Sequence, residues 1–164
     1  MKSKSLPVII FIWLFVAAFS AFASAPDKKL IGYRHEGVRY GEKLPNGATD
    51  LGGGLLSDED YGVTHFKKGK KYMLWLERIV ERNEAGVPVW EVLDVLSVGA
   101  LKKNQEFLFS YSSPCKQNKK GNLDLIVLAE SVPRTKARRV LKAWRANVKK
   151  EKFEPVSVKG IVCR

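Results

Sequence analysis

Two long apolar runs, separated by one short polar break, constrain the fold of this chain most strongly. The first run extends from Tyr72 to Val80, the second from Val87 to Val98, and residues 82–86 divide them. Side chains that are β-branched or aromatic dominate both runs, which favours strands over helices. Pro88 also argues against a helix interior, because proline cannot donate the helical hydrogen bond. The pattern therefore predicts a β-hairpin, and a charged turn at residues 67–71 lies directly before it.

Shorter apolar segments further along the chain predict more antiparallel pairing. The run from Glu106 to Tyr111 and the run from Leu123 to Ala129 flank a polar loop, so they predict a second hairpin. A last apolar strand, from Val156 to Val162, ends at Cys163. The sequence predicts an α+β fold that is dominated by antiparallel strands.

The segment of residues 134–150 fits two interpretations. Ala137, Leu141, Trp144 and Val148 recur at helical spacing, which indicates an amphipathic helix. The same segment also alternates with period two from residue 142 to 148, and residues 149–152 can form a hairpin turn back to a strand at 153–158. We favour a short helix near residues 134–143 that continues into a strand.

Residues 24–62 differ from the rest because they are rich in glycine and lack apolar periodicity. We expect an irregular, loop-rich segment there that wraps a β-rich core of residues 67–164. Together, residues 24–164 form one globular domain in this interpretation, and that length is sufficient to bury a core.

The first 23 residues have the features of a signal peptide. Lys2 and Lys4 precede an apolar stretch from Val8 to Phe19, and Ala21 and Ala23 supply the small residues of a cleavage site. This stretch is shorter than the roughly 20 apolar residues that a spanning helix needs. The sequence predicts cleavage after Ala23 and a periplasmic or secreted protein.

The two cysteines, Cys115 and Cys163, are expected to form a disulfide. Export places them in an oxidising compartment, and their number is even. No Cys-x-x-Cys motif indicates a redox site.

A basic segment near the C-terminus is the first candidate binding site in this chain, whose formal net charge is +12. No acidic residue interrupts it, and a cationic surface with an aromatic side chain attracts polyanions. The alternative is a solvated basic face whose Trp144 lies in the core. The candidate residues are Arg134, Lys136, Arg138, Arg139, Lys142, Trp144 and Arg145.

An acidic cluster offers a second candidate site. Asp58, Glu59 and Asp60 follow a glycine triplet, and His65 comes shortly after, so an acid–base centre is one interpretation. The other is a turn or a helix cap with acidic residues in its first turn. The spacing fits neither a calcium loop nor a phosphate loop, and we expect no cofactor or metal.

These patterns favour a non-enzymatic binding or interaction protein of the cell envelope. Its expected partner is an anionic envelope polymer, a membrane surface or another protein, and specific nucleic-acid binding is not expected. The alternatives are a small exported hydrolase that uses Asp58, Glu59, Asp60 and His65, and a secreted protein inhibitor.

The cleavage site yields a direct prediction. Protein recovered from the envelope or the medium should begin at Ser24, because small residues occupy the positions that signal peptidase reads. N-terminal sequencing tests this prediction. An intact leader on protein recovered from the cytoplasm would contradict it.

Overall fold

The fold was determined as a computed structural model, which describes residues 28–37, 40–44, 46–109, 115–118, 120–132 and 138–163. The predicted leader, residues 1–23, lies outside this described part. Antiparallel strands make up most of the described chain, and its only helical segment is the 3-10 turn η1 (Lys28–Leu30). In these residues no helix has the length and apolar character needed to cross a membrane.

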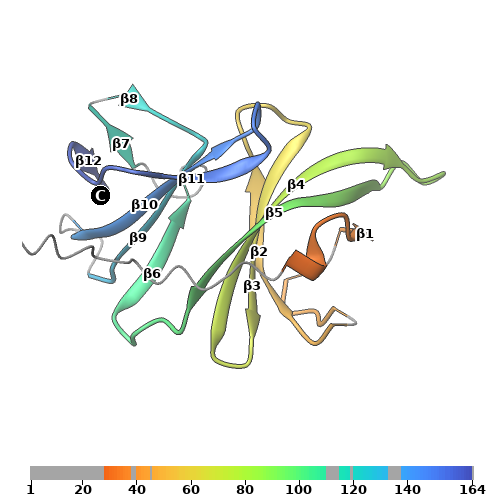
Figure 1. Ribbon diagram of the computed structural model, residues 1–164, viewed down its shortest axis with the longest axis horizontal. Coiled ribbons are helices and arrows are strands. Elements are labelled where there is room, and N and C mark those ends of the chain that lie inside the picture. Colours follow the sequence, from red (N-terminus) through yellow and green to blue (C-terminus); the bar gives the residue numbers. More distant parts are fainter. Residues whose placement is uncertain are drawn as a thin grey trace, which may run out of the picture.

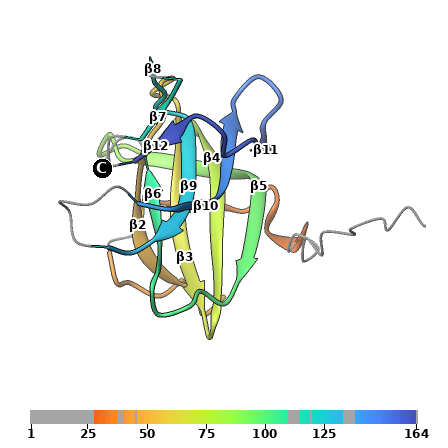
Figure 2. The ribbon, with the colours of Figure 1, turned by 90° about the vertical axis from the view of Figure 1, so that its left-hand side faces the viewer.

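Three antiparallel sheets build the domain (Figure 1). The five-stranded sheet has the order β1-β5-β4-β3-β2, the four-stranded sheet the order β11-β10-β9-β6, and the three-stranded sheet the order β12-β7-β8. Figure 2 shows the four-stranded sheet in front of the five-stranded one. The five-stranded sheet contains β1 (Arg34–Glu36), β2 (Thr49–Leu55), β3 (Tyr61–Lys68), β4 (Lys71–Arg82) and β5 (Pro88–Gly99). The four-stranded sheet contains β6 (Gln105–Phe109), β9 (Leu125–Glu130), β10 (Val140–Asn147) and β11 (Lys152–Val156). The three-stranded sheet contains β7 (Lys116–Gln117), β8 (Lys120–Gly121) and β12 (Ile161–Val162).

Both predicted hairpins are confirmed. Strands β4 and β5 pair from Tyr72↔Gly99 to Arg82↔Pro88, and β6 pairs with β9. The hairpin that returns to Trp144 is confirmed as well, because β10 pairs with β11 and places Trp144 opposite Pro155.

The α+β label and the short helix near residues 134–143 are not confirmed. Residues 133–137 lie outside the described part, and residues 140–147 form β10. This strand has a partner on each side, β9 and β11, so both rows of its backbone groups can be paired without a helix. Its burial favours a strand too, since Ala143 and Trp144 are both buried although their side chains project to opposite faces.

The expectation of an irregular segment over residues 24–62 also needs correction, because Thr49–Leu55 forms the edge strand β2. A register shift between Asp50 and Gly53 interrupts its pairing with β3. Gly53 lies so close to β3 that a Cβ atom there would be 2.5 Å from the carbonyl oxygen of Val63. Gly53 therefore permits the close approach of β3, and this part of the chain is a strand, not a loop.

Strand β4 divides the hydrophobic core into two clusters. Leu74 and Leu76 face the four-stranded sheet and pack with Phe109, Ile126 and Ala146. The alternate residues on the opposite face pack beneath the N-terminal segment, in a cluster of Leu44, Ala48, Phe66, Met73, Trp75, Val92 and Val95 with Leu30 and Tyr33. The outer face of the five-stranded sheet, which points away from the four-stranded sheet, is thus partly covered by residues that precede β2.

The disulfide between Cys115 and Cys163 is confirmed, with an S–S distance of 2.09 Å. Both cysteines are buried in a third cluster, with Leu125, Val127 and Ile161 among its members. The bridge joins the segment that enters β7 to the residue that follows β12, so it closes the three-stranded sheet covalently.

Removing this bridge should destabilise the domain. The cysteines are 48 residues apart, and closing a loop of that length contributes about 4 kcal/mol in the chain-entropy account. Urea unfolding of the Cys115→Ala, Cys163→Ala double variant should show most of this loss. The reduced wild-type protein serves as the control, since it keeps the sulfur atoms and loses only the bond. A loss below about 1 kcal/mol in both proteins would contradict a structural bridge.

Candidate functional site

A cleft of about 230 Å³ opens on the outer face of the five-stranded sheet. Each of the five strands contributes one polar or aromatic side chain to its lining: His35 from β1, Asp50 from β2, Thr64 from β3, Glu77 from β4 and Trp90 from β5. Tyr40, from the segment between β1 and β2, also lines the cleft, as do Gly37, residues 52–55 and Gly62. The sheet thus gathers in one place residues that are far apart in the sequence.

Strand pairing sets the positions of these side chains. His35 lies directly opposite Trp90 in the β1–β5 pair, and Gly62 lies opposite Glu77 in the β3–β4 pair. Because Gly62 has no side chain, the ring of Trp90 can lie against its backbone, within 3.3 Å of where a Cβ atom would be. Any larger residue at position 62 would displace this wall of the cleft.

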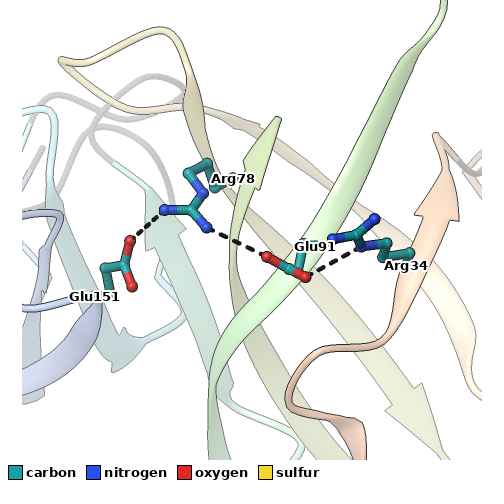
Figure 3. Close-up of polar contacts among 4 residues, drawn as sticks. All are labelled: Arg34, Arg78, Glu91 and Glu151. Atoms are coloured by element: carbon teal, nitrogen blue, oxygen red, sulfur yellow. Dashed lines mark hydrogen bonds and ion pairs between the residues drawn. The ribbon is translucent and has the colours of Figure 1, made fainter. Parts of the chain in front are cut away.

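Strand β1 has only three residues, and a chain of ion pairs reinforces its attachment (Figure 3). Arg34 Nε donates to Glu91 Oε1 at 3.1 Å, and Arg78 Nη2 lies 3.3 Å from Glu91 Oε2. Arg78 Nη1 then reaches Glu151 Oε1 at 2.7 Å, in the turn between β10 and β11. These exposed pairs are individually weak, but together they link the strand that carries His35 to both large sheets.

Glu77 is the centre of the cleft floor and is only 2% exposed. Its Oε1 atom accepts from His35 Nε2 at 2.8 Å, and its Oε2 atom accepts from Thr64 Oγ1 at 2.6 Å. Both carboxylate oxygens therefore have a donor, as a buried charge requires.

His35 has an acceptor at each ring nitrogen. Its Nδ1 atom lies 3.0 Å from the carbonyl oxygen of Glu36, which can only accept, and its Nε2 atom faces the Glu77 carboxylate. A proton on each nitrogen satisfies both contacts, so the surroundings of His35 favour its charged form. Burial lowers the pKa of His35, but the hydrogen bond and the charge of Glu77 outweigh it, and the pKa is raised above 6.5.

Asp50 is the second buried carboxyl group of the floor, at 4% exposure. Its Oδ1 atom accepts a hydrogen bond from the backbone N–H of Gly52. Burial raises the pKa of Asp50, and the Gly52 hydrogen bond and the charge of His35 offset only part of that rise.

Aromatic rings fix the orientation of His35. Tyr33 stacks on its ring with centroids 5.8 Å apart and an interplanar angle of 18°, and Trp75 contacts it edge-on at 5.8 Å. The ring of His35 thus lies in contact with Tyr33 and Trp75, and its Nε2 atom is bonded to the Glu77 carboxyl group, so several contacts position it before any ligand enters. In the part of the chain that the structure describes, no group of three or more His, Cys, Asp or Glu residues is arranged to hold a metal ion.

The residues predicted for a hydrolase are not brought together. Asp58, Glu59 and Asp60 are exposed in the turn between β2 and β3, and none of them lines the cleft. His65 is five residues beyond Asp60 along β3, about 16 Å of extended strand. Its ring packs among Tyr72, Phe107 and Phe109, and burial lowers its pKa to about 4.

The residues of the predicted basic binding site do not share one surface: some are buried and others are exposed. Trp144 is only 8% exposed and lies near Phe107, as the core alternative held. The side chain of Arg138 is largely buried and pairs with Glu106 at 2.9 Å. Arg139, Lys142 and Arg145 are exposed, but the alternation of β10 sends Lys142 and Arg145 to opposite faces. Arg134 and Lys136 lie outside the described residues.

The cleft could not be predicted from a local motif, because its five side chains come from five strands. Glu77 carried the one available signal. It follows Met73 and Trp75 at alternate positions of an apolar strand, which places a carboxylate on a buried face. A charge in that position calls for a buried partner, and His35 is that partner.

Comparison with protein-family models, with curated proteins and with solved structures finds no match for this chain.

The His35–Glu77 pair yields a pH prediction. Replacing Glu77→Gln should lower the pKa of His35, because the variant removes the main causes that raise it and leaves burial. In the wild type, the stability that this pair contributes is present below pH 6.5 and is lost as the pH rises through the raised pKa. Histidine NMR titration and urea unfolding across that range measure both effects.

His65 provides the internal control in the same spectra. Its folded pKa of about 4 should not change in the variant, and it gives the opposite trend, since stability falls as the pH drops from 6.5 towards 4. Equal His35 midpoints in the two proteins would show that Glu77 does not hold the proton on His35.

Proposed function

We propose that this chain is an exported, non-enzymatic binding protein whose ligand site is the cleft on the outer face of the five-stranded sheet. The convergence of His35, Asp50, Thr64, Glu77 and Trp90 from five strands carries this proposal. Clefts that combine aromatic walls with a few fixed polar groups are typical of ligand sites. The disulfide is compatible with the oxidising environment of an exported protein.

The buried ion pair of His35 and Glu77 is better explained by a ligand site than by a contribution to stability. Replacing a buried ion pair by apolar residues is often neutral or stabilising, so stability alone does not explain His35 and Glu77. Both side chains line the open cleft, where their charges can act on a bound molecule. Shifted pKa values in a cleft, such as those of His35 and Asp50, point in the same direction.

Binding is favoured over acid–base catalysis by the hydrogen bonds of the floor. Both ring nitrogens of His35 are engaged by protein oxygens, so neither is directed at a bound molecule. Thr64 donates its hydroxyl proton to Glu77, a carboxylate that already neutralises His35, so the threonine is not paired with a free base. The arrangement fixes charge in place, as a binding site requires.

NMR mapping of the isotope-labelled mature protein tests the proposal. We expect a small-molecule extract of the producing cells to shift the indole signal of Trp90 and the amides of residues 52–54, while the indole of Trp144 stays fixed. Trp144 is the matched control because it is a tryptophan of the other sheet, outside the cleft lining.

The same experiment separates the cleft from a polyanion site. If the exposed cations of β10 bind an anionic envelope polymer, then heparin fragments at low salt should shift Lys142 and Arg145 and leave Trp90 unchanged, and added salt should reverse the shifts. That result, with no response of the cleft to any extract, would replace the cleft proposal with the polyanion one.

A further inference from the structure

The hydrogen bonds of the cleft floor leave acceptors available and donors occupied. Both N–H groups of His35, the hydroxyl of Thr64 and the N–H of Gly52 all donate to protein oxygens. Each carboxylate oxygen can accept a further hydrogen bond, since an ionised carboxyl group has about four lone-pair sites. A ligand that reaches Asp50 and Glu77 therefore binds them through donors of its own.

The cleft of this strongly basic protein is lined by two carboxyl groups and one histidine. His35 pairs with Glu77 at 2.8 Å, and Asp50 is the second buried carboxyl group. The chain has 29 Lys and Arg residues, yet none lies among the described residues that line the cleft. Asp50 thus has no Lys or Arg beside it in this lining, and burial raises the pKa of its carboxyl group, while the charge of His35 and the Gly52 hydrogen bond lower it.

Aromatic rings form the walls beside this carboxylate. Trp90 is held against Gly62, and Tyr40 lies beside Gly52, where a Cβ atom would be 3.6 Å from the tyrosine ring. Tyr40 is 79% exposed, so it contributes little to the core and presents its ring to the cleft and the solvent. The faces of such rings attract cations.

We infer that the cleft binds a small organic ammonium, whose N–H groups donate to Asp50 and Glu77 and whose charge lies between the rings of Tyr40 and Trp90. This inference rests on the proposed function and adds the chemical class of the ligand. The cleft is smaller than the roughly 300 Å³ at the lower end of drug-sized sites, so the bound group is a small amine or the end of a lysine side chain. A neutral saccharide fits less well, because the floor offers it no free donor from His35 or Thr64.

Calorimetry on the mature chain with two ligands of one shape tests the inference. The ligands are n-butylammonium and n-butanol, which have the same alkyl chain but end in an ammonium group and a hydroxyl group, respectively. We expect the ammonium to bind about tenfold to a hundredfold more tightly, the range for hydrogen bonds to charged groups. Nα-acetyl-lysine methylamide distinguishes a lysine side chain from a free amine, since a peptide ligand should bind more tightly than n-butylammonium.

Matched variants locate the effect. Asp50→Asn keeps an acceptor for the Gly52 N–H but removes the charge, and it should weaken ammonium binding about tenfold while n-butanol binding is unchanged. Asp60→Asn removes the same charge from the exposed turn and should have less than about a twofold effect. Tyr40→Leu should weaken ammonium binding about twofold to fivefold, and Tyr40→Phe should preserve most of it.

The alternative outcomes separate this inference from the proposed function. If n-butanol or glucose binds as tightly as the ammonium, shifts Trp90 and is insensitive to Asp50→Asn, the cleft is a binding site and the ammonium inference is wrong. If no tested ligand binds at millimolar concentration while a cell extract still shifts Trp90, the inference also fails and the proposed function stands. If neither the ligands nor the extract affects the cleft, both are wrong.

Discussion

The alternation of side chains along β4 is the constraint on which the rest of the structure depends. This strand pairs with β3 on one edge and β5 on the other, so its backbone is fixed on both sides. Leu74 and Leu76 then belong to the core between the sheets, while Met73, Trp75 and Glu77 face the outer side. A slip of one residue would exchange these faces and place Glu77 between the two sheets.

Burial of Glu77 requires a polar partner, and β1 supplies that partner by pairing with β5. An isolated carboxylate on a buried face would be strongly unfavourable, and the hydrogen bonds with His35 and Thr64 offset part of that penalty. His35 reaches Glu77 because β1 pairs with β5 in the register that places His35 opposite Trp90. The same contacts that make the strand arrangement tolerable also create a rigid, charged floor, so fold and site share one set of interactions.

The strands were predictable where a local pattern specifies them. The hairpins at residues 72–98 and 106–129 follow from β-branched runs with polar breaks, and the pairing of Trp144 with the strand at 153–156 follows from alternation around a turn. Strand β2 was missed because glycine has little strand propensity, and its role depends on the approach of β3, which only the tertiary structure shows. The cleft was missed for a related reason: His35 and Glu77 are 42 residues apart, so no cluster of neighbouring residues marks the pair.

The shortness of β1 has a consequence for exchange with solvent. Three residues on a single partner strand are expected to open more readily than the twelve-residue strands beside them, since local opening follows the least paired parts of a sheet. When β1 separates from β5, His35 leaves Glu77, and water reaches a carboxylate that is otherwise enclosed. Fraying of this sheet edge thus couples hydrogen exchange at β1 to loss of the His35–Glu77 contact, while the twelve-residue strands β4 and β5 keep their pairing.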